Sequence, residues 1–310
     1  MPASTIKRPY RGRFAPSPTG PLHFGSLVAA VGSYLDARSH GGRWLLRLED
    51  VDLPRCQPGA AESILRTLTA FGFEWDGEVM VQSRRDGAYR AAFETLRGSG
   101  RIFPCACTRR EIADAQLQHG PLLASDGAEI YPGTCRAGLM PGRMARSWRL
   151  RVDGDVIDFD DAVQGHVMQD LAGEVGDFVL LRADGLFAYQ LAVVVDDAAE
   201  DVTDIVRGAD LLDSTPRQVL LQRLLGLATP TYTHLPVAVN AAGEKLSKQT
   251  GAAPLDTTRP QRALMNALRF LGQTPPGELS EASLADFWHW ATVHWDLLRV
   301  PRRRMLAVPE

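Results

Sequence analysis

The first hundred residues alternate between short apolar runs and segments whose apolar residues recur at helical spacing. Residues 11–15 (RGRFA) and 42–52 (GRWLLRLEDVD) are typical of strands, and the second run ends in carboxylates. Residues 24–38 and 58–73 repeat apolar side chains every three or four positions, as helices with one buried face do. This order of strand, turn, helix, strand and helix predicts a parallel α/β sheet.

The pattern changes after residue 100. Residues 102–146 hold many glycines and prolines and predict an irregular section. Strands and helices resume beyond it, and the chain ends in helical patterns. Strands are expected at 147–152, 156–161, 178–182, 186–197, 201–208 and 234–240, and helices at 86–97, 215–225, 263–272 and 283–298.

These elements predict an α/β fold with a Rossmann-type parallel-sheet domain that is split by an insertion. The two halves of this domain are expected at 1–100 and 181–250. The α+β insertion takes residues 101–180 and contains the cysteine-rich segment. Residues 251–310 form a small helical C-terminal part.

Composition narrows the class of protein without identifying it. Of 310 residues, 45% are hydrophobic and 23% are charged, so a globular protein with a large core is expected. A net charge of −3 argues against a globally basic nucleic-acid binder but allows a local basic face. No run reaches the ~18 apolar residues of a membrane helix, and the basic N-terminus lacks the apolar part of a secretory signal. We therefore expect a cytoplasmic protein without membrane contact.

The segment RFAPSPTGPLHFGS (13–26) places prolines, glycines and small polar residues just before a helix. A helix N-terminus has unpaired N–H groups and a partial positive charge, so it favours phosphate. Small residues let a nucleotide approach the backbone, and His23 can donate a hydrogen bond to a phosphate oxygen. An ordinary loop with a surface histidine is the alternative on this segment alone.

The segment EKLSKQ (244–249) lies on a glycine-flanked loop about 220 residues further on. Lys245 and Lys248 are spaced to contact a triphosphate and to neutralise the charge that develops as pyrophosphate leaves. A solvated basic turn is the alternative, and the upstream HFGS turn makes it the weaker one.

Three of the four cysteines fall in the irregular section. Cys105, Cys107 and Cys135 have a spacing that allows a tetrahedral zinc site in a reduced chain, and His119 is a candidate fourth ligand. Free buried thiols are the alternative. A site closed by protein ligands would be structural, and Cys56 lies outside the cluster.

Both loops resemble motifs of a known enzyme family. PSPTGPLHFGS (16–26) resembles the HIGH signature, and KLSKQ (245–249) the KMSKS signature, of class I aminoacyl-tRNA synthetases. Together with LRLEDVDLPR (46–55), these motifs are similar to the glutamyl branch, and most similar to its short paralogues, the glutamyl-Q tRNA(Asp) synthetases. Two positions depart from the signatures, Ser26 in place of the second histidine of HIGH and Gln249 at the end of KLSKQ. The resemblance spans residues 11–275.

The resemblance implies which residues form the site. Glu49 would accept from the α-ammonium of glutamate, and Arg13 and Arg207 would bind its carboxylates, with either pairing possible. Structural salt bridges and core packing are the alternatives for these residues. The implied glutamate residues are Arg13, Phe14, Ala15, Pro16, Ser17, Glu49, Tyr189 and Arg207. The implied ATP residues are His23, Gly25, Ser26 and Lys248, the catalytic ones are His23, Lys245 and Lys248, and Tyr131 joins Cys105, Cys107 and Cys135 as a zinc ligand.

The resemblance also implies a reaction. Glutamate and ATP, with Mg²⁺ on its phosphates, would give glutamyl-adenylate without tRNA. Glutamate would then pass to the cyclopentenediol of queuosine at the wobble position of tRNA(Asp), whose anticodon stem-loop enters the site. About 60 residues follow Gln249, too few for the anticodon-binding region of a full glutamyl-tRNA synthetase, and a monomer is expected. The alternatives are a truncated synthetase that charges a tRNA 3′ end and a non-catalytic synthetase-like binding module.

Overall fold

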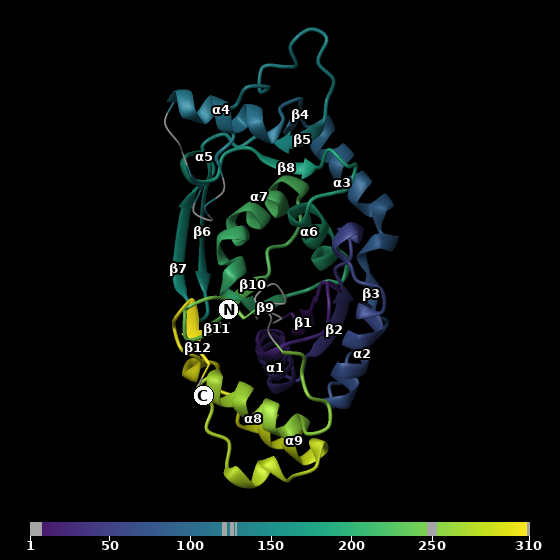
Figure 1. Ribbon diagram of the computed structural model, residues 1–310, viewed down its shortest axis with the longest axis vertical. Helices are drawn as coiled ribbons and strands as arrows, with labels where there is room; N and C mark the ends of the chain where they lie inside the picture. The colour runs from purple at the N-terminus through teal and green to yellow at the C-terminus, as the bar shows by residue number, and fades with distance from the viewer. Residues whose placement is uncertain (1–7, 120–122, 125–126, 128, 247–252, 309–310) are drawn as a thin grey trace, which may run out of the picture.

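A computed structural model describes residues 8–119, 123–124, 127, 129–246 and 253–308 of the chain. The molecule is elongated, and the strands within residues 11–48 and 204–235 lie near its middle (Figure 1). The elements around β4 (Ile102–Cys105) and α4 (Arg109–His119) occupy one end of the long axis, and α8 (Pro260–Phe270) and α9 (Leu284–Val293) occupy the other. Within the described ranges, no helix combines the length and the apolar character that crossing a bilayer requires.

Two sheets meet at the centre of the fold. The first is parallel and has the order β1 (Arg11–Phe14), β2 (Arg43–Leu48), β3 (Met80–Val81). The second has the order β7 (Gly165–Asp170), β6 (Val156–Asp161), β10 (Thr231–Leu235), β9 (Asp204–Gly208), and β10 runs parallel to both of its neighbours. The Thr203 N–H donates to the Arg11 carbonyl at 2.9 Å, so β1 adjoins the start of β9.

Two groups of helices pack against these sheets in separate hydrophobic clusters. The first group surrounds α1, and it contains α1 (Phe24–Ser39), α2 (Ala60–Ala70), α8 (Pro260–Phe270) and α9 (Leu284–Val293). The second group contains α3 (Asp86–Gly98), α6 (Tyr189–Ala199) and α7 (Thr215–Leu225).

The insertion has its own antiparallel sheet and a small core around two cysteines. The sheet order is β4 (Ile102–Cys105), β5 (Ser147–Leu150), β8 (Phe178–Leu181), with α4 (Arg109–His119) beside it and α5 (Leu171–Glu174) after β7. Near the C-terminus, β11 (Val237–Val239) pairs in parallel with β12 (Met305–Ala307).

The strand expected at 186–197 is wrong, because this segment forms helix α6 from Tyr189 to Ala199. Its apolar run is buried on most sides, and a short continuous apolar run does not distinguish a strand from a buried helix. The segment 102–146 is also less irregular than expected, since it contains β4 and α4. The run 234–240 is divided at Pro236 between β10 and β11.

Other expectations are confirmed. The strand at 156–161 and the helix at 215–225 have the expected bounds, and α1 begins at Phe24.

The antiparallel hairpin β6–β7 lies inside the residues assigned to the insertion, but β6 pairs with β10. This part of 101–180 therefore extends the sheet of the second half.

Candidate functional site

The start of α1 forms one wall of a pocket. His23 is the N-cap residue, and its Nδ1 accepts a hydrogen bond from the Ser26 N–H at 3.4 Å. Because Nδ1 is the acceptor, a neutral ring holds its proton on Nε2. The helix dipole adds positive potential at this end, so the turn favours an anion.

The loop after β11 passes directly over this helix start. The Leu246 N–H donates to the Ala238 carbonyl at 2.8 Å, and the Leu246 carbonyl oxygen lies 3.3 Å from where a Cβ on Gly25 would be. A larger residue at position 25 would press against the loop, so glycine permits the close approach. The fold thus brings the HFGS turn and the first part of the EKLSKQ loop together.

The pocket between these segments has a volume of about 440 Å³. Lys245 lines it and donates from Nζ to Asp210 Oδ2 at 2.6 Å, and Asp210 lines the same pocket. Lys248 lies outside the described residues. The other sequence-predicted residues in the lining are Phe14, Pro16, Ser17, His23, Gly25 and Ser26.

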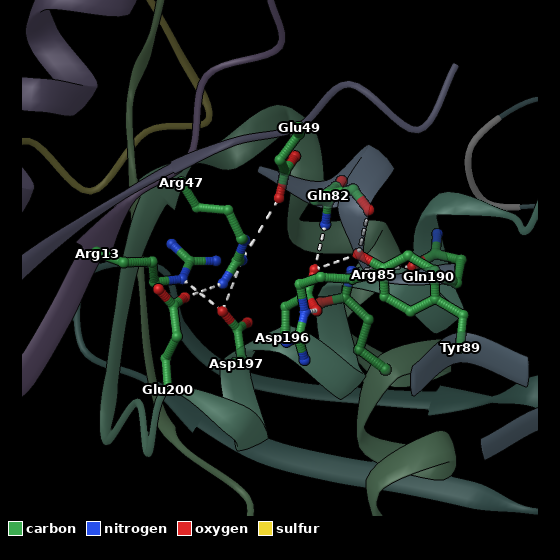
Figure 2. A network of polar contacts seen from close by, with 11 residues as sticks. Arg13, Arg47, Glu49, Gln82, Arg85, Tyr89, Gln190, Asp196, Asp197 and Glu200 are labelled. Carbon is green, nitrogen blue, oxygen red and sulfur yellow. Dashed lines mark hydrogen bonds and ion pairs between the residues drawn. The ribbon is translucent and has the colours of Figure 1, made fainter. Parts of the chain in front are cut away.

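A buried ion cluster lies between β1, β2 and α6, as Figure 2 shows. The guanidinium groups of Arg13 and Arg47 both contact Asp197 Oδ1, at 3.0 Å and 2.7 Å. Arg47 also donates to Glu200 at 2.6 Å and to Glu49 at 3.4 Å, and its side chain is fully buried. Two cations therefore face three carboxylates in a site of low solvent access.

Glu49 and Tyr189 belong to this buried region. Burial raises the pKa of the Glu49 carboxyl above its ordinary value, with Asp197 adding to the shift and Arg47 and Arg13 opposing it. Burial and the nearby Glu49 raise the pKa of the Tyr189 hydroxyl to about 12, against the effect of Arg207. Tyr189 therefore lies within electrostatic range of both the carboxylate and the arginine.

Arg207, on β9, has an incomplete set of hydrogen bonds. Its Nε donates to His234 Nε2 at 3.0 Å, and its Nη2 donates to Thr215 Oγ1 at 2.8 Å. Its Nη1 is buried and has no partner among the described residues. A buried charged donor without a partner is costly, and a ligand carboxylate would satisfy it.

The remaining residues predicted for the glutamate site lie where β1 ends. Phe14 is buried and stacks on Trp44, and Ala15 follows it half-buried. The Pro16 carbonyl accepts from the Glu49 N–H at 3.0 Å, and Ser17 is exposed. The backbone of this turn is thereby tied to the end of β2.

The cysteine cluster forms a compact group in the insertion. The sulfur atoms of Cys105, Cys107 and Cys135 lie within 4.8 Å of one another, and those of Cys107 and Cys135 are 3.6 Å apart. Tyr131 Oη lies 3.5 Å from Cys105 Sγ and 3.7 Å from Cys107 Sγ. His119 is the last residue of α4, and its side chain lies outside the described residues.

The thiols of this cluster differ in acidity. Burial raises the pKa of Cys105, but its hydrogen bonds with the Tyr131 hydroxyl and the Cys107 backbone lower it to about 7 overall. Burial and the neighbouring cysteines raise the pKa of Cys107 to about 11. Cys105 and Cys107 thus resist ionising together unless a cation compensates their charge.

Several residues of the site were not identified from the sequence. Arg47, Asp197 and Glu200 complete the ion cluster. Asp210 accepts a hydrogen bond from Lys245, and His234 accepts one from Arg207. Arg47 interrupts the apolar strand RWLLRL, and a charge there is a signal that a buried partner exists. The partners themselves are more than 20 residues away in the sequence, and no local pattern names them.

The chain is similar to proteins of known class. A family model described as "tRNA synthetases class I (E and Q), catalytic domain" matches residues 10–289. The glutamyl-Q tRNA(Asp) synthetase of Aromatoleum aromaticum is 64% identical over 301 residues, which are 97% of this chain and 93% of that protein. That of Dechloromonas aromatica is 61% identical over 304 residues, which are 98% and 100% of the two chains.

A solved structure has the same fold. A glutamate tRNA ligase from Elizabethkingia meningosepticum, in complex with its amino acid, superimposes with a TM-score of 0.79 at 25% sequence identity. The match covers 97% of this chain and 67% of that one.

Proposed function

We propose a specific reaction for this chain, which belongs to the family of class I tRNA synthetase catalytic domains for glutamate and glutamine. It activates glutamate with ATP, independently of tRNA, and transfers the glutamyl group to queuosine at the wobble position of tRNA(Asp). The choice among family reactions rests on relatives 61–64% identical that are named glutamyl-Q tRNA(Asp) synthetases. The observation that supports glutamate as the substrate is the group of buried charged residues beside the pocket, in which Arg207 Nη1 has no partner among the described residues.

The charges of this site match those of glutamate. Two guanidinium groups face three carboxylates, so the buried cluster is one positive charge short, and the α-ammonium beside Glu49 supplies it. The unpartnered Nη1 of Arg207 binds a substrate carboxylate. Tyr189, which lies within electrostatic range of Glu49 and Arg207, adds a hydroxyl donor.

Activation requires little covalent participation by the protein. An oxygen of the glutamate α-carboxylate attacks the α-phosphorus, the bond to the β-phosphate bridging oxygen breaks, and pyrophosphate leaves. His23, the first turn of α1, Lys245 and Lys248 stabilise the charge on the phosphates. Mg²⁺ on the ATP phosphates would neutralise part of that charge.

The second step moves the glutamyl group to RNA. A hydroxyl oxygen of the queuosine cyclopentenediol attacks the carbonyl carbon of glutamyl-adenylate, the bond to the AMP oxygen breaks, and AMP leaves with that electron pair. The hydroxyl proton passes to the departing phosphate or to solvent. An anticodon loop can present an unstacked nucleotide to such a pocket, as proteins that read RNA loops commonly require. ATP and tRNA, two of the three substrates, are cytoplasmic molecules, so the proposed reaction would occur in the cytoplasm.

We propose that the cysteine cluster binds one structural zinc ion through Cys105, Cys107, Cys135 and Tyr131. Tetrahedral Zn–S bonds of about 2.3 Å put two sulfurs about 3.8 Å apart, close to the 3.6 Å between Cys107 and Cys135. The ion would supply positive charge beside the Cys105 and Cys107 thiols, which would bind it as thiolates. It lies in the insertion and takes no part in the two chemical steps.

The test uses labelled glutamate, ATP and Mg²⁺ with two tRNA pools, one containing queuosine and one stripped of it. Label found only with the queuosine pool, and retained after removal of the tRNA 3′ terminus, is the expected result. Equal label in both pools, lost with the 3′ terminus, would identify a glutamyl-tRNA synthetase instead. No label in either pool, and no glutamate-dependent pyrophosphate exchange, would favour a non-catalytic module.

A further inference from the structure

We propose that Asp161 and His234 are positioning residues for amino-acid recognition, because they fix the guanidinium of Arg207 so that Nη1 faces the substrate. This inference rests on the proposed function, in which Arg207 binds a glutamate carboxylate. Neither residue lines the pocket or is expected to touch the substrate.

The hydrogen-bond donors determine the tautomer of His234. Arg207 Nε lies 3.0 Å from His234 Nε2 and is only a donor, so Nε2 must be the acceptor. The ring proton is then on Nδ1, which donates to Asp161 Oδ2 at 2.6 Å. The carboxylate therefore selects the tautomer that can accept from Arg207.

Asp161 is held in its ionised form. It is buried, and its Oδ1 accepts backbone N–H groups from Val163, Gln164 and His234 at 3.0, 2.8 and 3.1 Å. Burial lowers the pKa of His234 to about 4 together with Arg207, while Asp161 opposes that shift. The imidazole is therefore neutral at physiological pH, as the bond from Arg207 requires.

The other contacts of Arg207 leave one direction open. Thr215 Oγ1 accepts from Nη2 at 2.8 Å, and the Tyr232 ring lies 5.5 Å from the guanidinium carbon. Tyr232 also stacks on His234 with a centroid distance of 6.1 Å, which restrains the imidazole plane. With Nε and Nη2 held, the buried Nη1 is the nitrogen left for a ligand.

A purely structural role is the competing explanation. Asp161 ends β6 and His234 lies on β10. In this explanation, the sole role of their hydrogen bond is to attach the β6–β7 hairpin to the rest of the sheet. The two roles depend on different atoms of the imidazole. The structural role needs the Nδ1 donor, and positioning of Arg207 needs the Nε2 acceptor.

Two substitutions separate these atoms. In His234→Gln, the amide oxygen reaches the place of Nε2 and accepts from Arg207, but the donor to Asp161 is lost. In His234→Asn, the shorter amide still donates to Asp161 but does not reach Arg207. The experiment measures the KM values for glutamate and ATP and the kcat of pyrophosphate exchange, together with thermal unfolding.

Positioning predicts that His234→Asn raises the glutamate KM about tenfold to a hundredfold while the ATP KM is unchanged. His234→Gln should stay within about threefold of the wild type. A purely structural bond predicts the reverse, a greater effect of His234→Gln than of His234→Asn. Equal effects of the two variants on the glutamate KM, or a greater effect of His234→Gln, would therefore overturn the proposal. His166→Asn is the matched control, since it alters an exposed pair on the same hairpin, His166 Nδ1 to Asp160 Oδ1 at 3.0 Å.

Asp161→Asn tests the inference if His234→Asn does not fold. The new amide can donate to Nδ1, which moves the ring proton to Nε2 and sets it against the Arg207 N–H. A raised glutamate KM is expected, and an unchanged one would overturn the inference. If the wild-type chain itself shows no glutamate-dependent exchange, the proposed function fails, whereas an active wild type with unaffected variants removes the positioning role alone.

Discussion

The two sides of the candidate site are built differently. On the amino-acid side, Arg47 and Asp197 are 0% and 4% exposed, and their atoms meet at 2.7 Å. On the phosphate side, the Lys245 side chain is 50% exposed, and the His23 cap bond is long at 3.4 Å. Buried charges are costly unless other groups of the protein pair with them before the substrate binds. Exposed groups on a loop can instead neutralise phosphate charges when the nucleotide binds. Under the proposed function, the amino-acid site would be preformed, and the nucleotide would complete the phosphate site beside it.

The largest effect on stability is expected on the amino-acid side. Arg47→Met leaves Glu200 buried without its cation and Asp197 with Arg13 alone, which should lower the free energy of unfolding by about 3–5 kcal/mol. Urea unfolding followed by circular dichroism measures it. Arg110→Met is the control, because its pair with Asp114 is exposed and worth about 0–1 kcal/mol. Similar losses for the two variants would remove the distinction between the two sides.

The cysteine cluster sharpens the comparison, because it lies apart from both the amino-acid side and the phosphate side of the candidate site. Cys135→Ala should abolish zinc binding and lower Tm by roughly 5 °C or more. Elemental analysis and calorimetry measure this, with Cys56→Ala as a control that keeps both values. The glutamate KM should stay near that of the wild type, and a large rise would show that the insertion contributes to the preformed site.

Glu49 gives the amino-acid side a pH dependence. Its raised pKa means that the carboxylate protonates as the pH falls, which removes the charge that holds the ammonium. The glutamate KM in pyrophosphate exchange should therefore rise from pH 8 toward pH 5. Glu49→Gln should raise it about 10- to 100-fold at pH 8 and weaken the pH dependence, since charged hydrogen bonds contribute about 1.5–3 kcal/mol.

The stability of Glu49→Gln provides a check on this explanation. A carboxyl whose folded pKa is raised stabilises the protein only at low pH, and that contribution is lost as the pH rises through the folded pKa. At pH 8 the variant should therefore unfold at the same denaturant concentration as the wild type or a higher one. A large loss of stability would mean that Glu49 serves the fold rather than the substrate.

The smallest effect is expected on the phosphate side. Asp210→Asn weakens the exposed bond to Lys245 Nζ, so stability should change by less than about 1 kcal/mol. The ATP KM should change a few-fold and the glutamate KM should not. A stability loss comparable to that of Arg47→Met would show that this side is also preformed.

Local patterns in the sequence were enough for much of the fold. Helices α1 and α7 and strand β6 follow from apolar spacing and from turn residues, because these signals lie within one or two turns of chain. The motifs around His23 and Lys245 also predicted residues that line one pocket. The strand predicted for 186–197 was wrong because burial of this segment on most sides removes the periodicity that distinguishes a helix from a strand.

The sequence by itself therefore determined the family, the α/β class and the types of residue at the site. Only the tertiary structure decided which charges meet. Arg47 contacts Asp197 across 150 residues, and His234 contacts Asp161 across 73. A local pattern reflects interactions along one element, whereas these pairs depend on which elements pack together and on burial that makes each unpaired charge costly.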